Sequence, residues 1–433
     1  MMTNVSNLEE LIQAVLEGKP KINLIRSIVA RESIILGPGI SLEGKAQENG
    51  IFPTLSFEKT DGIGITENNS VSNLIIQAPS TKRALFLAST KDELGRFEFA
   101  NLYITGQFSF IAKKGVKKAQ IILDTITIVY AETIHYVETQ LKYGVTVRQG
   151  ALTIFNTSTD KESEVIVTAS NLTIGSAQLP VIGSGVFIAG FGDTGGRTTV
   201  EKLHTLNVHS NGKIPYGVAN CITGGIFILG GAHAKTIIHD GDIETYGVND
   251  MVLDAWGEVD EWVSNGVIRS YGASGVGFVN FGTVHKFIAN APIETYGEGA
   301  RGYNQYDGTL EYGEFHSIET FGNGSVGIQV SKKVGTILVN SDVKTNGDVG
   351  NSLVKGVNMD LPAYGLSVKD GGEIESLTIV GSIITAGKEA TAFTVEKGGV
   401  IHTMQVDGKI EAKGNNSKAK EVDPNSKVPE KFR

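Results

Sequence analysis

The chain has little of several residues that define common protein classes. Its 433 residues include a single cysteine, Cys221, which excludes an intrachain disulfide and a zinc site built on cysteines. Proline is scarce at 10 residues, and no apolar run reaches the length of a membrane span. Basic residues are scattered through a chain of net charge −9, whereas a nucleic-acid partner needs a basic stripe. We therefore expect neither a membrane nor a nucleic acid as partner.

The N-terminal segment also lacks the marks of a signal peptide. Met1 to Glu10 contains neither a basic region nor an apolar core. A cytoplasmic location follows as the expectation, and a secreted one if a leader has been removed.

A repeat dominates what the sequence does contain. Five stretches that read alike are spaced 25 residues apart: Ile243–Gly247, Ile268–Gly272, Ile293–Gly297, Ile318–Gly322 and Val343–Gly347. A fixed period of this length predicts a repeat architecture. The 54 glycines, set among 40% hydrophobic residues, are typical of an all-β chain with many turns.

Each repeat contains two further β-rich runs. In one repeat they are Gly277–Asn280 and Val284–Ile288. Three short strands per coil of about 25 residues predict a parallel β-helix with three faces. We assign it to residues 21–414, and assign the polar residues 415–433 to a disordered tail.

The first 20 residues predict a helix that caps this solenoid. Ser6 and Glu9 have the spacing of a capping box, apolar residues recur on one face over 6–18, and Gly18 supplies a stop. A solenoid needs such a cap because an exposed coil end aggregates.

Stacked coils place equivalent residues in columns about 4.8 Å apart. The column Glu244, Arg269, Glu294, Glu319 and Lys344 is expected to point outward as solvated charge pairs. The aromatic column Tyr246, Tyr271, Tyr296 and Phe321 is expected to fill the core. A second aromatic column, Trp256, Phe281 and Tyr306, should lie near a turn beside Asp254. It is interpreted either as structural stacking or as a ledge that grips sugar rings.

The cap helix, the run Ile34–Leu42 with its continuation to Gly44, and the 25-residue coils resemble the pectin-lyase-like right-handed parallel β-helix superfamily. The resemblance covers most of residues 6–414 and rests on pattern and spacing. It implies a single-stranded, right-handed β-helix. That superfamily contains lyases, glycoside hydrolases, tailspikes and adhesins, but its known catalytic motifs are absent from this sequence, so no catalytic residue is carried over.

Two functions stay open. We favour a carbohydrate-active enzyme, a lyase, glycoside hydrolase or transglycosylase acting on an oligo- or polysaccharide in a cleft on the central coils. The alternative is a non-catalytic glycan-binding, adhesive or tailspike-like β-helix. No cofactor and no metal site is expected, and a homo-oligomer, dimer or trimer, stays open.

The candidate residues follow from the chemistry of glycan cleavage, which needs two carboxyl groups about 5 to 9 Å apart for hydrolysis. The candidates for catalysis are Asp193, His233, Asp254 and Asp307, with Asp254 paired to Asp193 or Asp307. The candidates for substrate binding are Arg197, Trp256, Phe281, Arg301, Asn304 and Tyr306. The glycine-rich stretch 190–197 is expected to form a flap over the cleft.

Overall fold

The computed structural model describes residues 2–48, 50–139, 143–354 and 356–433. Strands make up 57% of the structure and helices 4%, and the strands form long parallel sheets. The prediction of an all-β chain of parallel β-strand repeats is confirmed. No helix among these residues is long and apolar enough to cross a membrane.

The chain packs into two compact units that the repeat pattern did not separate. Unit 1 comprises residues 1–136, 149–209 and 228–236, and unit 2 comprises residues 137–148, 210–227 and 237–433. Strands β19 (Arg197–Asn211), β20 (Cys221–Ile228) and β21 (Ala232–His239) each contain residues of both units.

Unit 1 contains the helix α1 (Leu8–Leu16), the 3₁₀ turn η1 (Gly192–Thr194) and sixteen further strands. The strands are β1 (Thr3–Val5), β2 (Lys21–Leu24), β3 (Ile28–Ala30), β4 (Ile34–Ile35), β5 (Ser41–Gly44), β6 (Thr54–Phe57), β7 (Ile63–Ile65), β8 (Ser70–Gln77), β9 (Arg83–Leu87), β10 (Glu93–Thr105), β11 (Gln107–Ala112), β12 (Lys118–Tyr130), β15 (Gly150–Asn156), β16 (Glu164–Ile174), β17 (Val181–Ile182) and β18 (Ser184–Ala189).

The N-terminal cap of α1 differs from the predicted one by a residue. Asn7, not Ser6, is the N-cap, and its Oδ1 accepts from the Glu10 amide at 3.0 Å. Glu10, not Glu9, reaches back and accepts from the Ser6 amide at 2.7 Å. Glu10 is the third residue after the Asn7 cap, which is the position from which a carboxylate reaches back in a capping box. Here it bonds the amide of Ser6, one residue before the cap. Gly18, with φ 64°, follows the helix end.

Unit 2 repeats a three-strand coil. Its strands are β13 (Val137–Thr139), β14 (Thr146–Arg148), β22 (Ile243–Thr245), β23 (Asp250–Ala255), β24 (Glu258–Ser264), β25 (Ile268–Ser270), β26 (Val276–Asn280), β27 (Thr283–Ala289), β28 (Ile293–Thr295), β29 (Arg301–Gln305), β30 (Thr309–Phe315), β31 (Ile318–Thr320), β32 (Val326–Val330), β33 (Lys333–Val339), β34 (Val343–Thr345), β35 (Gly350–Val354), β36 (Val357–Leu361), β37 (Tyr364–Val368), β38 (Glu373–Ile379), β39 (Ile383–Thr385), β40 (Thr391–Val395), β41 (Val400–Val406), β42 (Ile410–Ala412) and β43 (Lys418–Val422), with the 3₁₀ turn η2 (Glu430–Phe432) after them.

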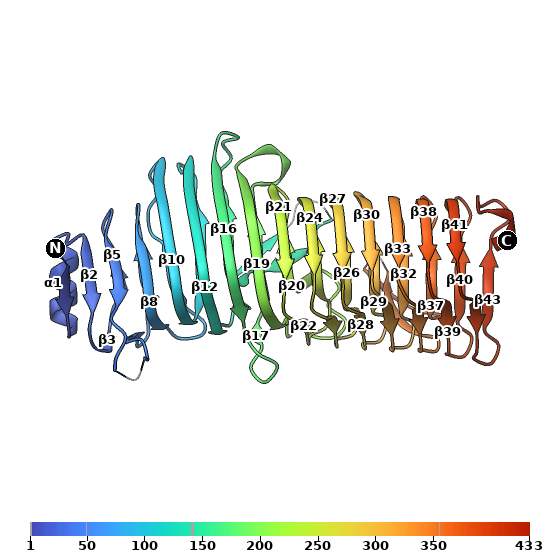
Figure 1. Cartoon of the computed structure of the whole chain (residues 1–433), viewed down its shortest axis with the longest axis horizontal. Coiled ribbons are helices and arrows are strands. Elements are labelled where there is room, and N and C mark those ends of the chain that lie inside the picture. Colours follow the sequence, from blue (N-terminus) through green and yellow to red (C-terminus); the bar gives the residue numbers. More distant parts are fainter. Residues whose placement is uncertain (1, 49, 140–142, 355) are drawn as a thin grey trace. The chain divides into compact units, whose positions relative to one another are not determined.

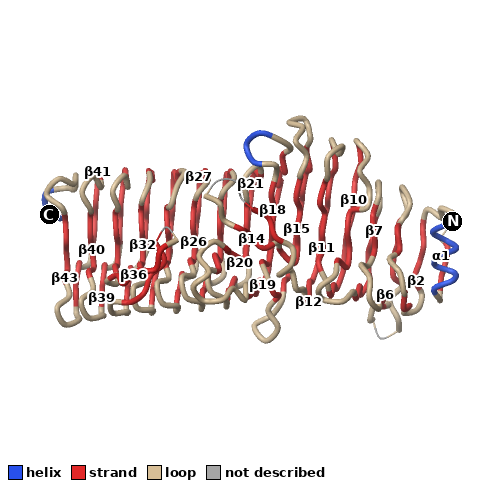
Figure 2. Tube along the Cα trace, turned by 180° about the vertical axis from the view of Figure 1, so that it is seen from behind, coloured by secondary structure: helices blue, strands red, loops and turns tan. Residues whose placement is uncertain are grey.

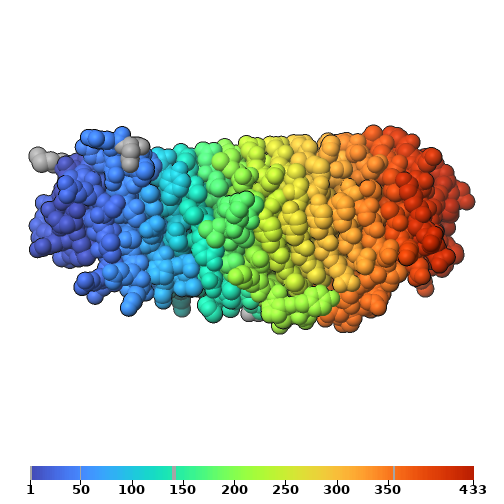
Figure 3. Space-filling model, turned by 90° about the horizontal axis from the view of Figure 1, so that it is seen from below, coloured from blue at the N-terminus to red at the C-terminus, as the bar shows by residue number. Residues whose placement is uncertain are grey.

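Equivalent strands of successive coils pair in parallel and in the register that the period predicts. Ile243 pairs with Ile268, Ile268 with Ile293, and Ile293 with Ile318. Figure 1 shows the third strands of these coils, β24, β27, β30, β33, β38 and β41, side by side. In the space-filling view the coils of unit 2 follow one another in sequence order, from yellow to red (Figure 3).

The core of unit 2 is formed by stacked side chains on one face of each strand. Leu253, Phe278, Tyr303 and Ile328 lie in consecutive coils and are fully buried. The rings of Phe278 and Tyr303 stack with centroids 5.5 Å apart. The parallel ladder places equivalent residues of successive coils next to each other, so an aromatic residue in one coil favours an aromatic residue in the next.

The C-terminal segment is the main departure from the predicted domains. Residues 415–433 were expected to be disordered, but β43 pairs in parallel with β40 along its whole length, and Phe432 is buried. The polar composition was misleading because a ladder is held by backbone hydrogen bonds, which polar residues also supply.

A column of glycines marks where consecutive turns come closest. Equivalent glycines follow the first strand of successive coils, at Gly272, Gly297 and Gly322. A Cβ on Gly297 would overlap the carbonyl oxygen of Gly272 in the coil before it. This contact involves backbone on both sides, so no side-chain rearrangement relieves it.

We predict that Gly297→Ala lowers the free energy of unfolding by about 1–3 kcal/mol, the usual cost of forcing an atom into a packed site. Thermal denaturation followed by circular dichroism measures it. Gly37→Ala is the control, because its Cβ would make only an ordinary contact, 3.5 Å from Ile40 Cδ1. Equal melting temperatures for the two variants would contradict the close approach.

Candidate functional site

The structure divides the predicted site residues between the units. Asp193 in η1 and Arg197 at the start of β19 are exposed, and His233 on β21 is half-buried; all three belong to unit 1. The pairing of Asp254 with Asp193 stays a prediction. The other seven lie on three neighbouring coils of unit 2: Asp254, Trp256, Phe281, Arg301, Asn304, Tyr306 and Asp307.

The second aromatic column forms as predicted from the register. Trp256, Phe281 and Tyr306 follow β23, β26 and β29, and the centroids of adjacent rings lie 4.6 and 4.7 Å apart. They are half-buried and tilted to one another. The column is thus a continuous aromatic surface three coils long.

This surface is not the bare ledge that the sequence suggested, because Tyr143 packs on it. The Tyr143 ring lies 5.4 Å from Trp256, 5.3 Å from Phe281 and 6.0 Å from Tyr306. Its hydroxyl donates to Asp307, and the ring is itself 42% exposed. Sequence reasoning missed Tyr143 because it stands outside the repeat and has no equivalent in the column.

The segment that carries Tyr143 belongs to a set of insertions that we call the cover: residues 143–148, residues 212–221 and β35. Thr146 on β14 pairs with Cys221, and Arg148 donates to the Gly212 carbonyl. Strand β36 of the β35–β36 hairpin crosses in front of β32 in Figure 2. This hairpin accounts for the longer step of 40 residues between the paired residues Val343 and Ile383. Tyr216 donates to Asn351 at 3.2 Å, which joins two parts of the cover.

Asp250 attaches the cover to β23. This buried carboxylate accepts from the Gly212 amide at 3.1 Å, from the Gly247 amide at 2.6 Å and from the Thr223 hydroxyl. Burial raises the pKa of Asp250 to about 6, and these hydrogen bonds oppose the rise. Asn249 adds a bond from its Nδ2 to the Val218 carbonyl at 2.6 Å.

Asp254 is the unusual group of the site. Leu253 and Ala255 face the core, so strand alternation turns Asp254 to the opposite side, where a solenoid normally meets water. Asp254 is nevertheless 0% exposed, because on that face it lies between Asp250 and Trp256, which both contact the cover. Neither of its carboxyl oxygens has a hydrogen-bond partner.

This environment favours the neutral form of Asp254. Burial raises the pKa of Asp254 well above its usual range, and the indole N–H of Trp256 lowers it only in part. The indole N–H lies close enough to favour the charged form, but its geometry falls short of a hydrogen bond, and it too is left without a partner. Asp254 is therefore a buried carboxyl group whose neutral form is favoured.

The guanidinium of Arg301 is bonded to acceptors within the protein, and its role in substrate binding stays a prediction. Arg301 is buried, and its guanidinium donates to the Gly299 carbonyl at 3.0 Å and to Ser352 Oγ and the Leu353 carbonyl, both at 3.2 Å. Burial lowers the pKa of Arg301 to about 10. These contacts attach β35 to β29, so Arg301 holds the cover in place.

The two remaining candidates, Asn304 and Asp307, lie on the second coil after that of Asp254. Val279 separates Asn304 from Asp254 in the column, and Asn304 Oδ1 accepts from Gln329 Nε2 at 3.3 Å in the next coil. Asp307 is half-buried and accepts the Tyr143 hydroxyl. The site thus combines one buried acid, one half-buried carboxylate, two amides and four aromatic rings.

The first aromatic column has the opposite burial to the expected one. Tyr271, Tyr296 and Phe321 are 41%, 40% and 36% exposed, although they were expected to fill the core. Their rings stack, with centroids 5.3 and 4.6 Å apart, at the corner where the strand ends. Alternation places Thr245 and its equivalents inward, and the ring one residue later points out.

The charged column beside these rings is outward, as expected. Arg269 lies between Glu244 and Glu294 and bonds both, with Nε 2.8 Å from Glu294. Lys344 pairs with Glu319 at 2.7 Å. Glu244 is only 7% exposed, so this part of the column is less solvated than expected. Partly exposed pairs such as Lys344 with Glu319 contribute about 0–1 kcal/mol each.

One further group has the donor atoms of a metal site. His402 Nε2 lies 3.1 Å from Glu373 Oε1 and 3.9 Å from Glu375 Oε2. Lys333 Nζ lies 3.5 Å from the same Glu373 oxygen and supplies the positive charge. We interpret the group as a surface ion-pair cluster.

Comparison with protein-family models, with curated proteins and with solved structures gives no match for this chain. The side chains described above are therefore the basis for the function of this chain.

The protonation of Asp254 predicts how stability depends on pH. The folded protein binds a proton that the unfolded chain releases near pH 4, so Asp254 lowers stability progressively as pH rises above about 4. Asp254→Asn keeps the shape of the side chain but removes the group that titrates. We expect its melting temperature to exceed that of the wild type by a margin that widens as the pH rises above about 4.

Differential scanning calorimetry of both proteins across this pH range measures that margin. The difference between variant and wild type isolates Asp254 from the other titrating groups, Asp250 included. A margin that is constant with pH would show that Asp254 is not buried as a neutral acid.

Proposed function

We propose that the chain closes into a single-stranded, right-handed parallel β-helix and acts as a carbohydrate-active enzyme. The three-strand coils with parallel register between equivalent strands support the closed helix. The substrate is an oligo- or polysaccharide bound beside β23, β26 and β29, where aromatic rings and amides lie together.

The observation that carries the proposal is the buried, unpartnered carboxyl of Asp254 beside Trp256. A carboxylic acid kept neutral by burial is the form a general acid needs to protonate a glycosidic oxygen. Asp254 gives its proton to that oxygen as the bond between the oxygen and the anomeric carbon breaks. Asp307, positioned by Tyr143, is the second carboxylate and takes the proton of the water or acceptor hydroxyl whose oxygen forms the new bond to the anomeric carbon.

The same contacts favour a neutral sugar and cleavage of the glycosidic bond by hydrolysis or transfer. A lyase needs a cation to neutralise the acid group of its substrate, and the guanidinium of Arg301 is occupied by the cover. Trp256, Phe281 and Tyr306 provide ring faces for sugar C–H groups. Tyr143 now covers those faces, so a bound sugar displaces Tyr143 or stacks on its exposed side.

An activity screen against neutral and acidic oligosaccharides tests this. We expect release of reducing ends, or a changed product pattern by mass, without the ultraviolet absorbance of an unsaturated product. Asp254→Asn should lower the rate roughly 100- to 10,000-fold, the usual contribution of a general acid. Ser367→Ala, a buried change in the same column, is the control and should keep full activity.

Unsaturated product would instead identify a lyase. A rate that Asp254→Asn leaves unchanged would remove Asp254 from the mechanism. If no substrate is altered, the enzyme proposal fails.

One observation favours the second candidate, a non-catalytic glycan-binding or adhesive β-helix. The stacked rings of Tyr271, Tyr296 and Phe321 are the more exposed aromatic column, and hydroxyl acceptors such as Glu294 lie beside them. Sugar binding there needs no buried acid.

Calorimetric titration with glycans separates the two columns. On the binding-module interpretation, Tyr296→Ala should weaken affinity at least tenfold, corresponding to about 1.4 kcal/mol, while Trp256→Ala has no effect. On the enzyme proposal the ranking is reversed. Both variants should keep the wild-type circular dichroism spectrum.

A further inference from the structure

The outer side of α1 is unusual for a solenoid cap. Leu11 and Ala14 are buried against the first strands of unit 1, beside which α1 lies in Figure 1. On the opposite side Leu16 is 77% and Ile12 43% exposed. A terminal cap normally presents a polar outer face, since that face keeps the array soluble.

Acidic residues surround this apolar stripe. Glu9 lies on the same side of α1 as Ile12 and Leu16, at the i, i+3 and i+7 spacing of one helix face. Glu10 and Glu17 are also exposed on α1 and at its end. The outer face of α1 is therefore apolar along its centre and bordered by Glu9 and Glu10, while Glu17 forms an ion pair with Lys19 at 2.9 Å.

The last coil of unit 2 leaves its core partly open. Ile318, Val343 and Ile383 are fully buried in their coils, but the equivalent Ile410 on β42 is only half-buried. The next coil would cover it. In its place is a hollow of about 370 Å³ with Val406, Ile410 and Phe432 among its lining residues.

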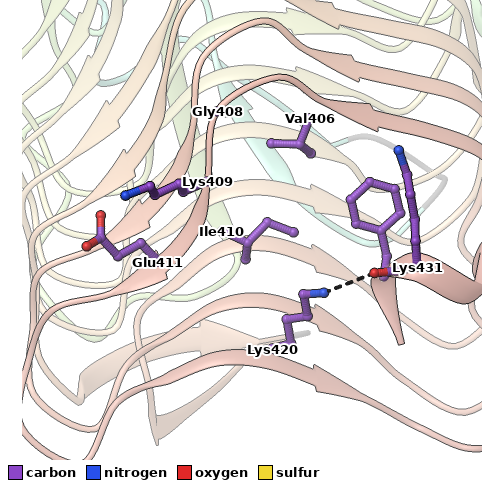
Figure 4. Close-up of a pocket in the computed structure, with 8 residues that line it drawn as sticks. Val406, Gly408, Lys409, Ile410, Glu411, Lys420 and Lys431 are labelled. Carbon is purple, nitrogen blue, oxygen red and sulfur yellow. Dashed lines mark hydrogen bonds between the residues drawn. The ribbon is translucent and has the colours of Figure 1, made fainter.

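Lysines surround this hollow. Figure 4 shows Lys409, Lys420 and Lys431 around Ile410 and Val406. The ammonium groups of Lys420 and Lys431 lie 5.6 and 4.7 Å from the centre of the Phe432 ring, and Lys420 donates to the Lys431 carbonyl at 3.3 Å. Glu411 is the one acidic residue of the lining.

We propose that copies of this chain associate head to tail, with the outer face of α1 in one copy seated on the C-terminal hollow of another. Leu16 and Ile12 pack against Ile410, Val406 and Phe432. The glutamates of α1 face the three lysines. The two surfaces are complementary to each other in charge and in apolar area. Neither surface is complementary in charge to a second copy of itself.

The contact is heterologous, because each copy contributes a different surface to it. A dimer formed in this way still has one unused surface of each kind, so association continues beyond the dimer. A nine-residue helix offers a small area, and the assembly is consequently weak and sensitive to salt. This inference is independent of the proposed enzyme activity.

Sedimentation velocity on the full chain tests it, over about 1 μM to about 1 mM protein, which brackets weak association. We expect the average sedimentation coefficient to rise with concentration and to fall when salt is added. Leu16→Asp removes the α1 surface and Lys420→Glu with Lys431→Glu removes the other; each variant alone should stay monomeric. Glu9→Lys is a milder second change of the α1 surface and should weaken association partly.

An equimolar mixture of the two variants gives the sharpest result. Each has one intact surface, so the mixture should form dimers and nothing longer. Lys388→Glu, a charge reversal at an exposed lysine outside the hollow lining, is the control and should assemble as the wild type does. Unchanged circular dichroism spectra ensure that each variant is folded.

A wild type that is monomeric over the whole range would overturn the proposal. So would a mixture that forms no dimer, or oligomers that persist in either variant alone, as an isologous dimer or a side-by-side trimer would. Binding of an unrelated acidic peptide to the wild type without self-association would assign the hollow to another partner.

Discussion

The pairing of each strand with its equivalent in the next coil is the constraint on which unit 2 depends. Parallel backbone hydrogen bonds hold the coils about 4.8 Å apart and in register. Every residue then has its equivalent as nearest neighbour along the stack. Glycine must follow glycine at the closest turn, and aromatic rings and opposite charges gain by stacking. The same ladder incorporates the polar residues of β43, because it needs no apolar side chain.

Function in such a fold depends on where this regularity is interrupted. The three parts of the cover fall outside the 25-residue period, and they bury a strand face that would otherwise meet water. Once buried, the carboxyl of Asp254 becomes a neutral acid. Arg301 and Asp250 belong to the regular coils, and their charged groups form hydrogen bonds with residues of the cover. Their burial is thus the structural condition for the state of Asp254.

The first strands of unit 1 and the last strands of unit 2 are further places where the regular pairing is interrupted. A ladder has no internal reason to stop, so each end must be covered by something that is not a coil. α1 covers the first strands and the segment around Phe432 covers the last, and each leaves some apolar surface uncovered. The sequence indicated a cap at the first end. It predicted disorder at the other, because a cap of few apolar residues resembles a tail in composition.

The sequence by itself determined the all-β class, the period, the register of the central coils and the two aromatic columns, since stacking repeats a local pattern. Only the tertiary structure decided which outer faces are covered. Trp256 was interpreted either as structural stacking or as an exposed ledge, and it is half-buried beneath Tyr143. Tyr296 was expected to lie in the core and is 40% exposed. The alternation of a strand shows which side a residue faces but not what lies there. Tyr143 and the β35–β36 hairpin reach the site from outside the repeat, and no periodicity contains that information.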